Sequence, residues 1–233
     1  MSARWIAIIV LIILLLLRRR PRDAAADTSG TDEQSTTQGR QVPMRATSFP
    51  DRQSSNVAIW RAARECGASP MQAVFVAAHT SIAGKPWRGR AYCYNAWGIL
   101  ATGWHGDYFV SGGVRYRAYH SWREGACDYI SLIQRRYDGA WDLAGQGKVC
   151  AYVDVLYDRH YYGRGHSREW YKRAMYLAVR NVVADLRAAG IDPGEPDYTG
   201  CPTHPVTDGD EGDGTPPPTE AGGADFGEYM WAG

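Results

Sequence analysis

Two side chains in the middle of the chain, Asp107 and His120, are of types that move protons at neutral pH. A carboxyl group or an imidazole with a suitable pKa can protonate a leaving oxygen or activate a water molecule. Both types are also common in exposed turns, so an ordinary surface role stays open for each. Whether they do chemistry depends on the elements that hold them.

Aromatic residues are abundant, with 9 Trp and 15 Tyr among 233 residues. Such residues can fill a core, but a flat apolar face beside polar groups also suits stacking on a sugar ring. Trp87, Trp97 and Trp104 are the candidate stacking platforms in the middle of the chain. The composition is therefore compatible with a carbohydrate-binding groove.

Charge is unevenly distributed, although the formal net charge is only +1. Residues 56–189 hold 18 Lys and Arg against 10 Asp and Glu, whereas residues 190–233 hold 10 acidic residues and no Lys or Arg. A basic folded part suits an anionic partner such as a cell-wall polymer, a nucleic acid or a lipid surface. The alternative is a solvated surface that the chain's own tail balances.

The five cysteines do not define a metal site or a compartment. Neither a C-x-x-C pair nor a Cys/His spacing typical of zinc is present. An odd count leaves at least one thiol unpaired in a monomer. One or two disulfides and buried free thiols are equally compatible with the spacing, so the redox compartment stays open.

The N-terminus carries an uninterrupted apolar run at residues 5–17, followed directly by Arg18, Arg19 and Arg20. The run is short for a full membrane span, which usually needs about 20 residues, and a signal-peptide core is the alternative. The arginines favour an uncleaved single-pass anchor in residues 1–22, and the positive-inside rule places them on the cytoplasmic side. In a virion membrane, inside and outside would have to be redefined.

Composition divides the rest of the chain into three parts. Residues 23–55 are polar without apolar periodicity, which predicts a disordered linker, and residues 56–190 form the folded domain. Residues 191–233 are rich in Pro, Gly and acids, which predicts a disordered tail. The apolar residues 226–231 at its end are a candidate docking motif for a protein partner, or simply part of the tail.

The domain is predicted to be mainly helical. Ser69, Pro70 and Gln72 give a capping box at the start of a helix over residues 69–82, whose nearly continuous apolar filling makes it central. His79 near its end is better explained as a hydrogen-bonded histidine of the core or its rim than as a catalytic acid. Further helices are expected at the following residues: 57–66, 121–137, 148–157 and 168–189.

A β-hairpin is expected between the helices at residues 69–82 and 121–137. Its strands are predicted at residues 108–110 and 114–119, joined by a glycine-rich turn. The sequence around it is loop-rich. The expected fold class is therefore mainly α, strictly α+β, with one small hairpin.

The order of the motifs resembles the glucosaminidase family of peptidoglycan hydrolases over residues 58–183. Residues 95–99 (NAWGI) resemble the family's N-L-F-G-I, and residues 116–121 (YRAYHS) resemble F-R-x-Y-x-S. Asp128 and Tyr129 follow at the usual distance, and residues 161–162 resemble the tyrosine loop of the family. The resemblance implies a lysozyme-like helical fold.

The resemblance also implies which residues line a substrate cleft. Asn95, Tyr119, Tyr161 and Tyr162 would contact the glycan, with Tyr161 binding sugar or steering a water, while Trp97 would replace a Phe that fills the core. The implied protein is a membrane-anchored, peptidoglycan-degrading glycosidase of a bacterial envelope or a membrane-containing virion. The implied partners are peptidoglycan glycan strands, with no metal, no cofactor and no nucleic acid.

The chain departs from the family at the catalytic positions. The family's A-x-x-E-S-x-x-G becomes residues 77–84 (AAHTSIAG), so Thr80 stands where the general acid belongs. His120 replaces a family Asp, which leaves Asp107 as the best carboxylate. A threonine hydroxyl cannot protonate a glycosidic oxygen at neutral pH. An inactive peptidoglycan-binding module is therefore the alternative to an enzyme, and a scaffold without a glycan role is a third hypothesis.

Overall fold

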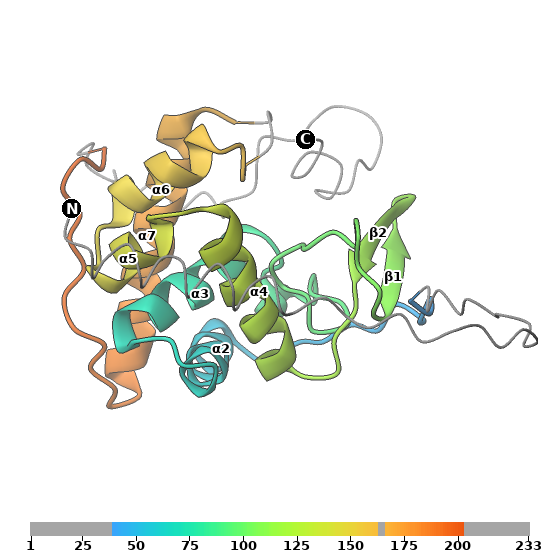
Figure 1. Ribbon diagram of the computed structural model, residues 1–233. Helices are drawn as coiled ribbons and strands as arrows, with labels where there is room; N and C mark the ends of the chain where they lie inside the picture. The colour runs from blue at the N-terminus through green and yellow to red at the C-terminus, as the bar shows by residue number, and fades with distance from the viewer. Residues whose placement is uncertain (1–38, 163–165, 203–233) are drawn as a thin grey trace, which may run out of the picture. The chain divides into compact units, whose positions relative to one another are not determined.

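The computed structural model describes residues 39–162 and 166–202 (Figure 1). These residues form a mainly helical domain with one two-stranded hairpin, which confirms the expected fold class at this level. The expected anchor at residues 1–22 and the apolar segment at residues 226–231 lie outside the described residues. Across the described ranges, no helix combines the length and apolar character needed to cross a membrane.

Helix α3 (Pro70–Ile82) is the central element, as the sequence predicts. The Ser69 hydroxyl accepts a hydrogen bond from the Gln72 backbone N–H at 3.2 Å, and the Gln72 side chain accepts one from the Ser69 N–H at 2.8 Å. Its residues from Met71 to Thr80 are buried except Gln72, because α2, α4, α5 and α7 surround it. An apolar helix therefore lies in the middle of the domain.

The remaining helices agree with the sequence to within a few residues, except that one was not expected. Their bounds are α2 Arg52–Glu65, α4 Trp122–Arg136, α5 Ala140–Gly145, α6 Val149–Asp158 and α7 Arg168–Ala188. Helix α5 was missed because it has only six residues and Gly139 at its N-cap provides no side-chain hydrogen bond.

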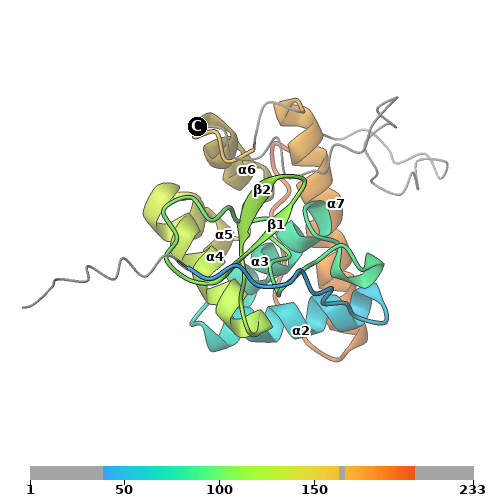
Figure 2. The same cartoon turned by 90° about the vertical axis from the view of Figure 1, so that its right-hand side faces the viewer.

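A second, smaller lobe surrounds the hairpin, and we call residues 39–50 and 83–120 the β-lobe (Figure 2). Strands β1 (Tyr108–Ser111) and β2 (Val114–Arg117) pair antiparallel, and a short 3-10 helix, η1 (Pro86–Arg88), follows α3. The β-lobe has its own apolar cluster, separate from the helical core, made of Cys93, Phe109, Tyr116 and Ala118 with Val42, Tyr92, Leu100 and Val114 against it. The domain therefore has two cores.

The folded region extends beyond both expected boundaries. Helix α2 begins at Arg52, because the Asp51 carboxylate caps it by accepting the Ser54 N–H at 2.7 Å. Before it, the Val42 N–H donates to the Tyr108 carbonyl at 2.8 Å and the Cys93 N–H donates to the Arg45 carbonyl at 2.8 Å. The prediction of a linker up to residue 55 is therefore wrong for residues 40–55.

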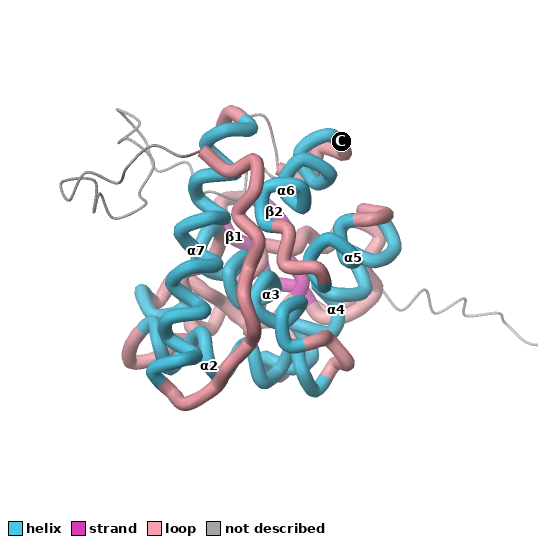
Figure 3. The backbone as a smooth tube through the Cα atoms, turned by 90° about the vertical axis from the view of Figure 1, so that its left-hand side faces the viewer, coloured by secondary structure: helices cyan, strands magenta, loops and turns pink. Residues whose placement is uncertain are grey.

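The C-terminal boundary is corrected in the same way. Residues 191–202 run back across the helical face after α7 (Figure 3), and the Val149 N–H donates to the Asp197 carbonyl at 2.9 Å. Cys201 is then joined to Cys150 by a disulfide. The prediction of a disordered tail from residue 191 is wrong up to residue 202, because disulfide pairing and backbone contacts are not visible in composition.

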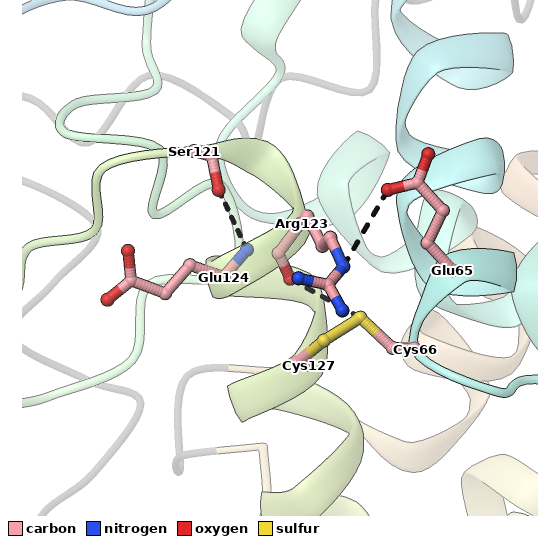
Figure 4. Close-up of a disulfide and its surroundings, with 6 residues drawn as sticks. All are labelled: Glu65, Cys66, Ser121, Arg123, Glu124 and Cys127. Carbon is pink, nitrogen blue, oxygen red and sulfur yellow. Dashed lines mark hydrogen bonds and ion pairs between the residues drawn. A yellow bond between two sulfur atoms is a disulfide. The ribbon is translucent and has the colours of Figure 1, made fainter.

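Two disulfides settle the alternative that the cysteine count left open. Cys66 at the end of α2 is bonded to Cys127 on α4 (Figure 4), and Cys150 is bonded to Cys201. They close loops with sequence separations of 61 and 51 residues. Cys93 is the free thiol of the described cysteines and is buried.

Candidate functional site

The end of α3 offers no acid. Thr80 is fully buried, and its hydroxyl donates to the Ala77 carbonyl of the same helix at 2.7 Å. Its own carbonyl accepts the Lys85 N–H at 2.7 Å as the chain turns out of the helix. The Thr80 hydroxyl therefore donates its hydrogen bond within the helix, and the side chain does not face solvent.

The loop at residues 95–99 is a structural clamp. The Asn95 amide nitrogen donates to the carbonyls of Ile99 and Arg117, both at 2.9 Å, and its oxygen accepts the Ile99 N–H at 2.9 Å. A Cβ on Gly84 would stand 2.6 Å from the Ala96 carbonyl oxygen, so only glycine permits this approach of α3 to the loop. Asn95 therefore ties the loop to the hairpin and does not present its amide to a ligand.

We expect Asn95→Ala to lower the free energy of unfolding by about 1–3 kcal/mol, because the Ile99 N–H and the Arg117 carbonyl lose the side chain that they bond. Urea denaturation followed by tryptophan fluorescence measures this loss. Asn181→Ala, at a half-buried position on α7, is the matched control and should change stability by much less. Equal stability of Asn95→Ala and the wild type would show that the amide does not hold the loop.

His79 lies at the centre of a buried cluster of tyrosines. The Tyr129 hydroxyl lies 2.6 Å from Nδ1 of His79, and the Tyr162 hydroxyl lies 3.1 Å from Nε2. The Tyr152 hydroxyl lies 3.2 Å from that of Tyr129, and the Tyr161 ring packs edge-on against the imidazole. The prediction of a hydrogen-bonded core histidine is confirmed.

Burial controls the protonation of this cluster. Loss of solvation lowers the pKa of His79 from 6.5 to about 3, because a charged imidazolium would lie away from water. The same loss of solvation raises the pKa of Tyr129, Tyr161 and Tyr162 well above 10. At neutral pH all of these groups are therefore uncharged and act as packing and hydrogen-bonding residues.

The aromatic residues expected in a cleft are mostly in the core. Trp97 is fully buried, stacks on Tyr129 with ring centroids 5.5 Å apart, and donates its indole N–H to the Val76 carbonyl at 3.0 Å. Tyr161 and Tyr162 are buried as well, and Tyr162 stacks on Tyr171 with centroids 3.9 Å apart. In this arrangement none of the three can contact a polymer.

The structure brings Asp107 and His120 together at the base of the hairpin. Nε2 of His120 lies 3.8 Å from the Asp107 carboxylate, and an Arg40 guanidinium nitrogen lies 3.2 Å from the same oxygen. The His120 side chain is 75% exposed and that of Asp107 is 19% exposed. A solvent-facing imidazole beside a partly buried carboxylate is an arrangement suited to proton transfer.

Trp104 lies beside this pair. Its indole N–H donates to the Asp107 carbonyl at 2.9 Å, and the Arg117 guanidinium lies 4.6 Å from the ring centroid. Trp104 and Trp87 are half-buried, unlike Trp97, and so remain able to contact a ligand. Trp87 lies in η1, where it follows the turn out of α3.

A second carboxylate, Asp128, was seen in the sequence only as a motif match. One of its oxygens accepts hydrogen bonds from the Arg117 guanidinium at 2.7 Å and from the Tyr119 hydroxyl at 2.6 Å. Burial is the main reason that the pKa of Tyr119 is well above 10, and the Asp128 charge adds to it. The R-x-Y spacing and the later Asp therefore encode a clamp between the hairpin and α4.

The site is thus smaller than the sequence suggests. Of the four candidate catalytic residues, Asp107 and His120 meet, whereas Thr80 and Tyr161 lie in the core. Of the six candidate binding residues, Trp87 and Trp104 keep exposed surface, whereas the other four, Asn95, Trp97, Tyr119 and Tyr162, are buried. Sequence reasoning missed Arg40, because no local pattern links it to a carboxylate 67 positions away.

Two further features of the described residues bear on the site. A shallow depression of about 350 Å³ lies between α2 and the end of α7, lined by residues such as Val57, Arg61 and Ala189, away from Asp107 and His120. No group of three or more His, Cys, Asp or Glu side chains within residues 39–162 and 166–202 is arranged to hold a metal ion. The Asp107–His120 pair is therefore the candidate site.

Comparison with protein-family models, with curated proteins and with solved structures found no match to this chain.

Proposed function

We propose that the chain is a membrane-tethered peptidoglycan-binding module with a lysozyme-like helical domain that does not hydrolyse the glycan from the end of α3. The observation that carries this proposal is the burial of Thr80. Acid catalysis of glycoside cleavage needs a carboxylic acid or an equivalent donor in reach of the leaving oxygen. Thr80 is fully buried and donates its hydroxyl to Ala77, so it offers neither the chemistry nor the access.

The binding surface that fits this proposal is the area around Trp104, Asp107, His120 and Arg40. The half-buried Trp104 indole keeps part of its apolar surface available to a sugar ring. The exposed Arg40 and His120 side chains offer donors for hydroxyl, amide and carboxylate groups, which peptidoglycan carries on its sugars and stem peptides. The surface therefore combines stacking with polar recognition.

The two disulfides support an oxidising compartment for the domain, where peptidoglycan is also found. Disulfides persist outside the cytoplasm and are rare within it. Arg18, Arg19 and Arg20 argue for the opposite orientation through the positive-inside rule. We give more weight to the disulfides, because they join residues more than 50 positions apart that the fold holds in place.

The test is co-sedimentation of the purified full-length protein with insoluble peptidoglycan, combined with analysis of released fragments. We expect the protein to pellet and no soluble fragments to appear. Trp104→Ala should weaken pelleting by roughly ten-fold, because loss of one stacking platform costs on the order of 1 kcal/mol or more. Trp141→Ala, at a half-buried position on α5, should leave pelleting unchanged. A wild type that stays in the supernatant would refute the proposal.

A hydrolase that uses Asp107 and His120 is the second candidate, favoured by the 3.8 Å separation of the two side chains. In it, Asp107 orients the imidazole and His120 exchanges protons with the substrate. Release of fragments by the wild type that is lost in both Asp107→Asn and His120→Gln would establish this candidate. Release by the wild type that neither variant changes would exclude this pair as its source.

A further inference from the structure

The β-lobe is much more basic than its surroundings. It contains seven Lys and Arg residues against one acidic residue, Asp107. Asp107 pairs with Arg40 at 3.2 Å, and Arg117 is neutralised by Asp128 on α4 at 2.7 Å. With Arg40 and Arg117 paired in this way, Arg45, Arg90 and Arg115 remain as exposed positive charges on a small lobe.

The exposed arginines follow one path across the β-lobe. The Arg115 guanidinium lies over the Tyr108 ring at 5.0 Å, and the backbone of Arg40 runs beside Tyr108, whose N–H donates to the Arg40 carbonyl at 3.0 Å. The chain then continues to Arg45, whose carbonyl accepts the Cys93 N–H. Ala46 forms an antiparallel backbone bridge with Tyr92, two residues after Arg90. Figure 2 faces this side, where the segment runs past the hairpin.

Three of these arginines have no acidic partner among the described residues. Within residues 39–162 and 166–202, no carboxylate lies within 4.0 Å of the guanidinium groups of Arg45, Arg90 or Arg115, and all three residues are exposed. Like charges gathered on one surface raise the free energy of the folded state and attract an anionic partner. The charge of the lobe therefore favours binding of a polyanion.

The same chain supplies a matching polyanion. Residues 203–233 contain seven acidic residues and no Lys or Arg. The 26 residues from 203 to 228, which include all seven acids, can extend to about 90 Å, enough to reach any face of a domain of this size.

We propose that the acidic segment at residues 208–228 docks on the arginines of the β-lobe and shields them from polyanions offered in trans. Tethering places the segment at an effective concentration of about 1 mM or more, so even a weak electrostatic contact is mostly occupied. An external polyanion then has to displace the segment. The contact weakens as ionic strength rises, because the charges are exposed.

The first test measures binding of fluorescein-labelled heparin to the full chain in detergent at low salt. The key variant keeps the length of the tail but replaces its seven acids by amides: D208N, D210N, E211Q, D213N, E220Q, D225N and E228Q. We expect this variant to bind heparin about ten-fold more tightly than the wild type, because the intramolecular competitor is lost. Equal affinities would overturn the proposal. Heparin reports on charge alone, so this result is independent of peptidoglycan binding.

The second test locates the contact with a photo-crosslinking amino acid at position 212, inside the acidic segment. Crosslinks should map to residues 39–50 and 83–120 and should disappear in the triple variant R45E/R90E/R115E. The matched control R61E/R135E/R180E makes the same change of charge at three exposed positions on α2, α4 and α7, and should keep the crosslinks. Crosslinks to the helices, or their equal loss in both triple variants, would overturn the proposal.

Discussion

Acidification from pH 7.5 to pH 4 is expected to cost the domain about 3 kcal/mol of stability through His79 alone. The folded domain keeps this imidazole neutral, because burial lowers its pKa from 6.5 to about 3. The unfolded chain takes up the proton below about pH 6.5, so the contribution of His79 is fully present above that pH and is lost as the pH falls toward 3. At pH 5 the expected loss is about 2 kcal/mol.

The groups that surround His79 do not titrate in this range. They are the tyrosines of the cluster, Tyr129, Tyr152, Tyr161 and Tyr162, whose pKa values burial raises. Each stays protonated from pH 7.5 to pH 4. Within this cluster, the acid sensitivity is therefore assigned to the His79 imidazole.

The measurement is urea denaturation of the wild type and of His79→Gln at several pH values. Glutamine keeps polar atoms near the tyrosine hydroxyls but has no proton to gain, so its curve of stability against pH should be flatter between pH 6.5 and 4. The variant is expected to be less stable than the wild type at pH 7.5. The test is therefore the slope of the stability against pH, not the stability at one pH. Parallel curves for the two proteins would mean that His79 is not the group that responds.

Removal of either disulfide is expected to lower the free energy of unfolding by about 3–4 kcal/mol, because each closes a loop of more than 50 residues in the unfolded chain. Cys66→Ser/Cys127→Ser and Cys150→Ser/Cys201→Ser are the two variants, and chemical denaturation measures both. Cys93→Ser is the control, since Cys93 takes part in neither disulfide. A disulfide variant as stable as this control would contradict the expectation.

The two disulfides should also differ in accessibility. Cys66 and Cys127 are half-buried between α2 and α4, whereas Cys150 and Cys201 are buried. Mild reductant under native conditions should therefore open the Cys66–Cys127 bond first, which alkylation followed by mass spectrometry would detect. Prior opening of the Cys150–Cys201 bond would show that the described exposure does not control reduction.

Local signals made much of the helical fold predictable. The capping box at Ser69 and the apolar filling that follows it identified α3, and the Gly112–Gly113 turn identified the hairpin. Helix α5 lacks such a signal. The ends of the folded region were also missed, because residues 40–47 are held largely by backbone hydrogen bonds, which leave little trace in the pattern of side chains.

The site was predictable in its chemistry but not in its exposure. The absence of an acid at Thr80 could be read directly from the residue type. The burial of Tyr161 and Tyr162 could not, because an aromatic side chain fills a core or lines a cleft with equal ease. The meeting of Arg40, Asp107 and His120 depends on the path of the N-terminal segment past the hairpin, which no local pattern encodes.

That N-terminal segment determines how the domain carries a mechanical load. A pull on the N-terminus acts first on the hydrogen bonds from Val42 to Tyr108, from Cys93 to Arg45 and from Thr47 to Ala91. We expect these bonds to break before force reaches α2 and the helical core. A pull on the C-terminus instead meets the covalent bond between Cys201 and Cys150. The domain is therefore expected to be mechanically asymmetric. Hydrogen bonds hold the β-lobe at the N-terminal end, whereas a disulfide holds the helical core at the C-terminal end.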